Sequence, residues 1–99
     1  MSFQIELHPK AIKELTESFQ WYEERSAGLG SCFIASVNKR LDEIAEQPDE
    51  FSKRKGNCRE VTTNVFPYII IYEILQKKRI VFVSFIFHTK INPTLKYKR

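Results

Sequence analysis

The sequence predicts an α+β fold in which a helical hairpin packs on one face of a mostly antiparallel sheet. Two apolar stripes with helical spacing occupy the first half of the chain and are separated by a short turn that contains glycine. Runs rich in β-branched and aromatic residues occupy the second half. The resulting order of elements is β-α-α-β-β-β. With 99 residues, 42% of them hydrophobic, we expect a single domain over residues 1–99.

The first two elements are a short strand and a helix. Residues 3–7 alternate apolar and polar side chains, which predicts a half-buried strand. Pro9 suits the first turn of a helix, where its missing N–H costs nothing. We therefore predict a helix over residues 9–26, with an apolar stripe made of Ile12, Leu15, Phe19 and Tyr22.

A second helix is predicted over residues 29–47. Gly28 precedes it and suits a left-handed backbone position after the first helix. Pro48 ends it, because the residue before a proline disfavours helical geometry. The apolar stripe of this helix consists of Leu29, Phe33, Val37, Leu41 and Ile44. The turn is so short that the two helices must be antiparallel neighbours.

The second half of the chain predicts a charged loop and three strands. The loop covers residues 48–57, and the strands cover residues 58–63, 65–75 and 79–87. Because residues 65–75 are apolar on both alternating faces, we expect a central strand that is covered on each side. Pro67 cannot donate a ladder hydrogen bond, so it belongs at the start of its strand or beside a bulge.

Two further segments complete the chain. Gln76, Lys77 and Lys78 predict a tight, charged turn between the last two strands. Residues 88–99 have no apolar period, and we expect an irregular, exposed tail.

Charge is divided unevenly along the chain. Residues 1–50 hold five basic and ten acidic side chains, a net charge of −5, whereas residues 51–99 hold eleven basic and two acidic side chains, a net charge of +9. This asymmetry indicates a basic half suited to a polyanion or to an acidic partner, or else only solvated surface charge. The candidate contact residues are Lys53, Arg54, Lys55, Lys90, Lys96, Lys98 and Arg99.

Several classes of protein are disfavoured by what the sequence lacks. The apolar runs are too short to span a bilayer, and the first ten residues do not resemble a signal peptide. Cys32 and Cys58 are too few for a disulfide framework, so we expect buried, reduced thiols in a cytoplasmic protein. No phosphate-binding loop and no metal-ligand spacing occurs, so we expect neither a cofactor nor a metal.

The remaining chemistry is cleavage of RNA without a metal. This reaction requires a base, cations that neutralise charge on the phosphate, and an acid. Arg59, Tyr68, Tyr72 and His88 are the residues able to serve. Each could instead have a structural role: an ion pair for Arg59, core packing for the tyrosines, and a hydrogen bond to backbone for His88. Trp21 either flanks the stripe of the first helix or docks a partner.

Taken in order, several short motifs resemble the RelE/ParE superfamily of toxins from bacterial type II toxin–antitoxin modules. The motifs are Trp21-Tyr22-Glu23-Glu24, Gly28-Leu29-Gly30 with Phe33, Pro48, Arg59, Phe66-Pro67-Tyr68 with Ile70 and Tyr72, and His88 followed by Asn92-Pro93. The resemblance implies a cytoplasmic toxin that a co-expressed antitoxin keeps silent. That partner would dock an acidic, partly disordered segment on the toxin, with Trp21 and Tyr22 as candidate docking residues.

The superfamily has two branches with different targets. ParE-like members poison DNA gyrase, whereas RelE-like members are metal-independent endoribonucleases that cut mRNA on the ribosome with a dispersed set of basic residues and a tyrosine or histidine. The present motifs are closer to the ParE side, although residues 89–93 lack the usual arginines. Arg59, His88 and Tyr72 are candidate catalytic residues only if the protein is RelE-like. The sequence is also compatible with a non-catalytic nucleic-acid-binding module and with an inactive remnant of a toxin.

Overall fold

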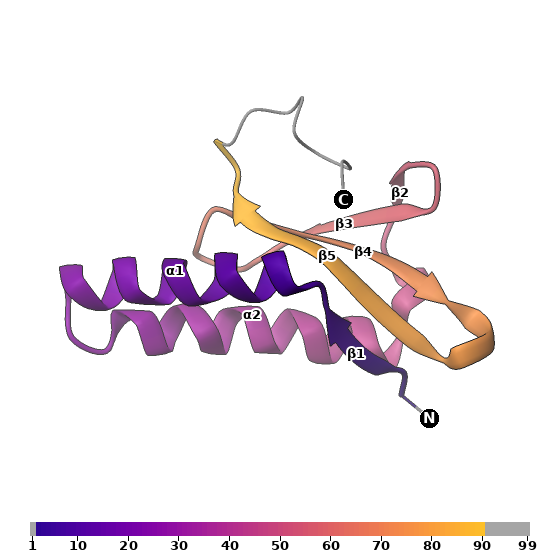
Figure 1. Cartoon of the computed structure of the whole chain (residues 1–99), viewed down its shortest axis with the longest axis horizontal. Helices are drawn as coiled ribbons and strands as arrows, with labels where there is room; N and C mark the ends of the chain where they lie inside the picture. The colour runs from indigo at the N-terminus through magenta and orange to yellow at the C-terminus, as the bar shows by residue number, and fades with distance from the viewer. Residues whose placement is uncertain (1, 91–99) are drawn as a thin grey trace.

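The computed structural model describes residues 2–90 and has the predicted α+β architecture, with two helices on one face of a mostly antiparallel sheet (Figure 1). The sheet has five strands, one more than the four predicted. Its elements are β1 (Gln4–Leu7), α1 (Pro9–Arg25), α2 (Leu29–Glu46), β2 (Lys53–Lys55), β3 (Cys58–Thr62), β4 (Tyr68–Leu75) and β5 (Ile80–His88). Single turns of 3-10 helix at Pro48–Glu50 and Gln76–Lys78 join α2 to β2 and β4 to β5. The predicted tail lies outside the described residues from residue 91 onwards.

The strands follow the order β1-β5-β4-β3-β2 across the sheet. β1 is parallel to β5, and every other neighbouring pair is antiparallel, so the sheet is mostly antiparallel as predicted. The first strand therefore lies beside the last one, which the order of elements alone does not determine. α1 and α2 lie side by side and cover the same face of this sheet (Figure 1).

Two segments in the second half differ from the prediction by more than one residue. Residues 48–57 are not wholly a loop, because residues 53–55 pair with β3 through a tight turn in which Gly56 has a φ of 55°. β4 begins at Tyr68 rather than at residue 65. Val65 has a φ of 73°, outside the β region, and Pro67 has no N–H to give to a ladder.

The helical hairpin depends on close contact between its two helices. Gly28 has a φ of 89°, as predicted, and turns the chain. Glu23 of α1 then caps α2, because its carboxylate Oε1 accepts a hydrogen bond from Gly30 N at 2.8 Å. A Cβ atom at Gly30 would lie 2.6 Å from Glu23 Cγ and 2.7 Å from the carbonyl oxygen of Phe19. Glu23 and Gly30 are therefore residues of the helix junction.

The buried face of α1 is rotated relative to the predicted stripe. Ala11 is fully buried, whereas Ile12 is 50% exposed, so Ile12 does not belong to the core. Leu15 and Tyr22 pack against the core as expected. Ala11, Leu15 and Tyr22 are spaced by four and seven residues, which places them on one side of a helix. The small side chain of Ala11 lets the start of α1 approach the sheet closely.

Apolar side chains lie on both faces of the sheet. On the helix side, Ile70 and Tyr72 of β4 are fully buried with residues of both helices. On the other side, Ile69 and Ile71 form a second cluster with Phe85 and Phe87 of β5. The prediction that β4 is a central strand with apolar contacts on both faces is therefore confirmed.

A bulge in β5 determines which of its side chains face the helices. Tyr72 pairs with Val83 and Ile71 pairs with Phe85, so Ser84 is an extra residue in β5. Val83 belongs to the helix-side cluster, but two residues later Phe85 belongs to the opposite cluster. After the bulge, Ile86 faces the helices.

Both cysteines are free, but they are not both buried. Cys32 is exposed, contrary to expectation. It immediately precedes the buried Phe33 in α2, and consecutive residues of a helix point in different directions. Cys58 is half-buried, and its thiol lies 3.8 Å from Oε1 of Glu73. Burial raises the pKa of the Cys58 thiol, and the Glu73 carboxylate raises it further.

Candidate functional site

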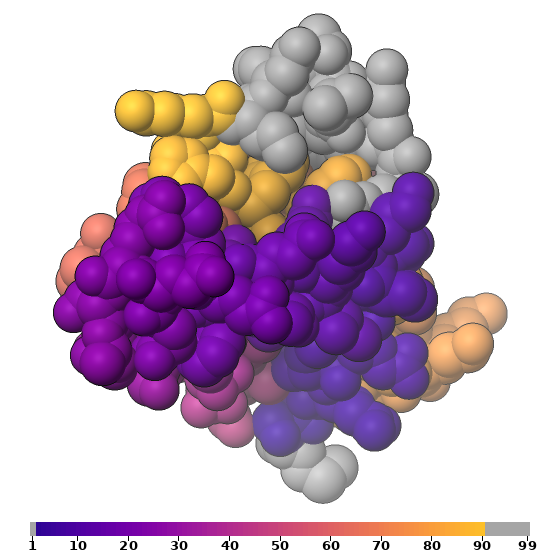
Figure 2. All heavy atoms as spheres, turned by 60° about the vertical axis from the view of Figure 1, so that its left-hand side comes forward, coloured from indigo at the N-terminus to yellow at the C-terminus, as the bar shows by residue number. Residues whose placement is uncertain are grey.

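A groove among the described residues lies between α1 and the end of β5. β1 ends at Leu7, opposite Val83, so beyond this point α1 is the neighbour of β5 on that side. Glu14 of α1 fixes the arrangement, because its carboxylate Oε1 accepts a hydrogen bond from Ile86 N at 3.1 Å. Figure 2 shows the yellow end of β5 directly above α1.

The groove has a volume of about 440 Å³ and a mainly aromatic lining. Its residues are Glu14, Glu17, Ser18, Trp21 and Tyr22 of α1, Tyr68 of β4, and Ile86, Phe87 and His88 of β5. Concave sites of this size with a few polar groups are typical binding sites. We name this feature the α1/β5 groove.

Trp21 and Tyr22, the predicted docking residues, both line the α1/β5 groove. Trp21 is 50% exposed and is held from two sides. The Arg25 guanidinium lies 3.8 Å from the centroid of the indole ring, and the Tyr22 ring packs edge-on at 5.1 Å. Burial raises the pKa of Tyr22, and the neighbouring Tyr68 raises it further. The groove therefore presents a fixed, partly exposed aromatic wall.

Tyr68 and His88 form the opposite wall. The Tyr68 hydroxyl donates a hydrogen bond to Ser18 Oγ at 2.9 Å, which ties β4 to α1. The rings of Tyr68 and His88 pack edge to face at 5.4 Å. His88 Nδ1 accepts a hydrogen bond from the backbone N–H of Lys90 at 3.1 Å, which is the structural role considered for this histidine. With Nδ1 as acceptor, the neutral ring carries its proton on Nε2.

Arg59 and Tyr72 lie together elsewhere, on the paired strands β3 and β4. The Arg59 guanidinium donates to the carbonyl oxygen of Phe51 and forms an ion pair with Asp49 at 3.5 Å. Tyr72 is fully buried, and its hydroxyl donates to the carbonyl oxygen of Pro48 at 2.7 Å. Burial raises the pKa of Tyr72 to about 12, although the nearby Arg59 charge partly opposes this shift. Both side chains therefore anchor the segment after α2.

The three candidate catalytic residues do not come together. His88 pairs with Tyr68, whereas Arg59 pairs with Tyr72, four residues further along β4. Four strand residues correspond to about 13 Å. A reacting group in contact with the His88 ring would therefore lie far from the Arg59 guanidinium.

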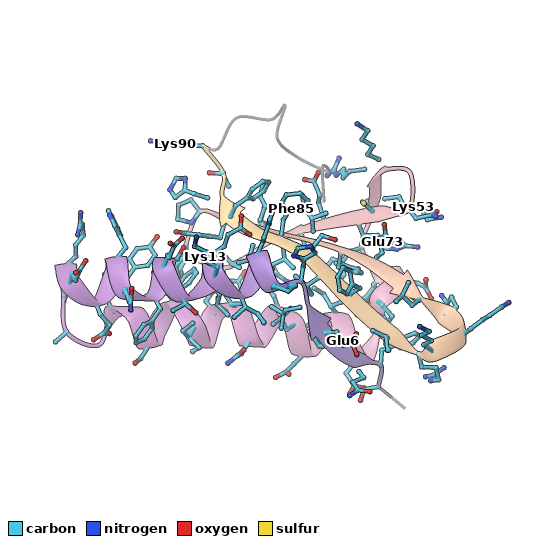
Figure 3. All side chains as sticks on the ribbon, viewed as in Figure 1. Glu6, Lys13, Lys53, Glu73, Phe85 and Lys90 are labelled. Atoms are coloured by element: carbon cyan, nitrogen blue, oxygen red, sulfur yellow. The ribbon has the colours of Figure 1, made fainter. Side chains whose placement is uncertain are left out.

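The predicted basic contact residues form two separate groups. Lys53, Arg54 and Lys55 are exposed on β2 at one edge of the sheet. Lys90 is exposed just beyond β5, and Figure 3 places it on the opposite side of the view from Lys53. Lys96, Lys98 and Arg99 lie outside the described residues.

Sequence reasoning missed the polar members of the α1/β5 groove. Glu14, Glu17 and Ser18 precede Trp21 by seven, four and three residues, so helical spacing places them on the same side of α1 as the indole. That spacing is a usable signal. The contact between Glu14 and Ile86 is not foreseeable, because it depends on where β1 ends.

The chain matches one protein family over most of its length. The family model described as the ParE toxin of the type II toxin–antitoxin system, parDE, matches residues 5–93. No curated protein matches the sequence. Within residues 2–90, neither helix has the length and apolar character needed to cross a membrane.

Solved structures share the fold at low sequence identity. The chromosomal ParDE TA system from P. aeruginosa has a TM-score of 0.74 at 10% identity, with 88% of this chain and 96% of that chain covered. The E. coli RelBE toxin–antitoxin complex has a TM-score of 0.69 at 22% identity, with coverages of 90% and 99%. The archaeal RelE–RelB complex from Pyrococcus horikoshii OT3 has a TM-score of 0.55 at 13% identity, with coverages of 93% and 100%.

Proposed function

Because the chain belongs to the ParE toxin family of type II toxin–antitoxin systems, within the RelE/ParE superfamily, we propose that it inhibits growth by acting on DNA gyrase. On this proposal the protein is not a catalyst. It binds gyrase and stabilises the complex in which the DNA is cleaved, and DNA damage follows.

The main support for this proposal is that the candidate catalytic residues do not lie together in one site. General acid–base catalysis needs its groups within hydrogen-bond reach of the reacting atoms. Arg59 is bound to the segment after α2, and Tyr72 is buried with its hydroxyl bonded to the same segment. His88 lies about 13 Å along the sheet from Tyr72. This arrangement favours a binding protein over a ribonuclease.

The choice of target is tested with purified protein in two assays. We expect the wild type to increase DNA cleavage by gyrase and to leave ribosome-bound mRNA intact. His88→Ala should keep its effect on gyrase. His8→Ala is the matched control, because His8 Nδ1 likewise accepts a hydrogen bond from the backbone N–H two residues later, at the start of α1. Cleavage of mRNA that is lost in His88→Ala but kept in His8→Ala would establish a RelE-like ribonuclease instead.

The partner that silences the toxin is, on our proposal, an antitoxin with an acidic, partly disordered segment. Two of the similar structures, RelBE and RelE–RelB, are complexes of a toxin with its antitoxin. Apolar side chains of the segment would occupy the α1/β5 groove beside Trp21, and its carboxylates would lie against β2. Folding on binding lets such a segment cover two separate surfaces.

Reversing charge on β2 is expected to slow association with the antitoxin. The Lys53→Glu/Arg54→Glu variant should lower the association rate constant at low salt by about tenfold and flatten its salt dependence, because steering by these charges is lost. Lys77→Glu/Lys78→Glu makes the same change in net charge at the exposed turn between β4 and β5 and serves as control. The measurement is stopped-flow association with the antitoxin encoded beside the toxin gene. Equal rates for both variants would exclude β2 as the electrostatic contact.

A further inference from the structure

The connection between β3 and β4 carries an exposed valine in a strained conformation. Val65 is 95% exposed, well above the 50% of Ile12 and Trp21, which are the other exposed large apolar side chains among the described residues. Its φ is 73°, a region that β-branched residues very rarely adopt. The backbone N–H of Phe66 donates to the carbonyl oxygen of Asn64 at 2.8 Å. This hydrogen bond closes a γ-turn around Val65 in its strained, positive-φ form.

Side chains from α2 hold this turn in place. Ser36 Oγ donates to the carbonyl oxygen of Asn64 at 2.7 Å, and Arg40 Nη2 donates to Asn64 Oδ1 at 3.0 Å. Within the turn, Thr63 Oγ1 donates to the carbonyl oxygen of Phe66 at 2.7 Å. Strain of this kind persists only where the surrounding structure over-determines the backbone. The fold therefore fixes the position of Val65. Glycine or asparagine would form such a turn with less strain than valine does.

The side chain that follows Val65 anchors the turn from inside. The Phe66 ring packs against Tyr22 at 5.0 Å and against Phe33 at 5.4 Å. Val65 and Phe66 thus point to opposite sides, one into solvent and one into the aromatic core. The salmon atoms of this connection project at the left edge of the space-filling view (Figure 2). Val65 is consequently presented from a rigid base.

The chemistry around Val65 selects a protein partner. No lysine, arginine or histidine occurs between residues 60 and 76. The Arg40 guanidinium lies near the turn, but it is bound to Asn64, to the carbonyl oxygen of Thr62 and to Glu43. The turn itself, residues 63–67, therefore offers no charged side chain to a phosphate group, whereas an apolar pocket on a protein would fit an aliphatic side chain.

We propose that Val65 is a preformed contact residue that inserts into an apolar pocket on the protein target of the toxin. The inference rests on the proposed function, in which the target is a protein, DNA gyrase. A side chain already held in its bound position loses little conformational entropy on binding. On this proposal the strained turn lowers the stability of the free protein but holds an aliphatic side chain in position for binding.

Two substitutions separate the strain from the contact. Val65→Gly removes both the side chain and the strain, whereas Val65→Thr keeps the shape and the strain but replaces a methyl group by a hydroxyl. We expect both variants to bind purified gyrase about tenfold or more weakly than the wild type. Only Val65→Gly should raise the midpoint of thermal unfolding, by about 4–8 °C. Ile12→Thr, at the half-exposed Ile12 of α1, is the control and should bind gyrase as the wild type does.

Growth inhibition after induced expression distinguishes failure of the inference from failure of the proposed function. If the wild type does not bind gyrase but Val65→Thr still loses toxicity, the proposed target is wrong and Val65 contacts another protein. If Val65→Thr remains fully toxic and binds gyrase normally, the inference is wrong. A loss confined to rescue by the co-expressed antitoxin would make Val65 an antitoxin contact, and a loss confined to self-association would make it a dimer contact. Either result overturns the proposal.

Discussion

Replacing Phe33 with alanine is expected to lower the free energy of unfolding by about 3–5 kcal/mol. Phe33 is fully buried at the point where the helices meet the sheet. Its ring lies 4.7 Å from Tyr68 and 5.2 Å from Tyr22, centroid to centroid. Truncation would leave a cavity between the rings of Tyr22, Phe66 and Tyr68, and the hydrogen bond from Tyr68 to Ser18 opposes its collapse. This loss is a large part of the free energy of unfolding of a domain of this size.

Denaturant unfolding measures this effect, and two further variants calibrate it. Phe33→Leu should cost clearly less than Phe33→Ala, because leucine fills part of the cavity. Ile12→Ala should cost about 1 kcal/mol or less, since Ile12 is half exposed. If Phe33→Ala unfolded at the same denaturant concentration as Ile12→Ala, the aromatic cluster would not be the centre of the core.

Raising the pH from 10 to 12 is expected to destabilise the protein through Tyr72. The folded chain keeps the pKa of this tyrosine at about 12, because burial disfavours the phenolate. In the unfolded chain the pKa returns to about 10. Between these values the unfolded chain has released a proton that the folded chain retains, so the free energy of unfolding falls as pH rises. The slope is at most about 1.4 kcal/mol per pH unit.

Tyr72→Phe is the matched control for this pH dependence. It loses the hydrogen bond to the carbonyl oxygen of Pro48, so we expect it to be less stable at neutral pH by about 1–3 kcal/mol. Between pH 10 and 12, however, its stability should fall by about 2–3 kcal/mol less than that of the wild type. Parallel curves for the two proteins would mean that Tyr72 ionises equally in the folded and unfolded chains.

The order of elements could be predicted because each depends on nearby residues. The stripe from Leu29 to Ile44 and the glycine before it determine α2 without reference to the sheet. The bulge at Ser84 is seen only in the pairing of β5 with β4. From the sequence, Val83, Phe85 and Phe87 form one alternating face, yet the extra residue sends Val83 to one side of the sheet and the two phenylalanines to the other. The only local sign of that change is Ser84, the one polar residue between Ile80 and Phe87.

The candidate site is predictable to a smaller extent. Trp21 can be identified because a tryptophan beside an apolar stripe has either a packing role or a docking role. Val65 is predicted to be part of a strand, since a β-branched residue next to phenylalanine has high strand propensity. Its positive φ results from bonds that Ser36 and Arg40 make to Asn64 across the fold. Such tertiary contacts override local strand propensity, and they cannot be predicted from the sequence of residues 63–67 alone.

The parallel pairing of β1 with β5 has a consequence for the timing of synthesis. Gln4 pairs with Ile80, and Leu7 pairs with Val83. β1, which is translated first, therefore cannot pair until β5 has been translated near the end. At about 5–20 residues per second, the ribosome needs roughly 4–15 s to proceed from the first of these residues to the second. During that interval the nascent chain lacks β5, which joins β1 to the rest of the sheet and against which α1 packs on its sheet side. The α1/β5 groove, to which β5 contributes Ile86, Phe87 and His88, therefore forms only at the end of synthesis.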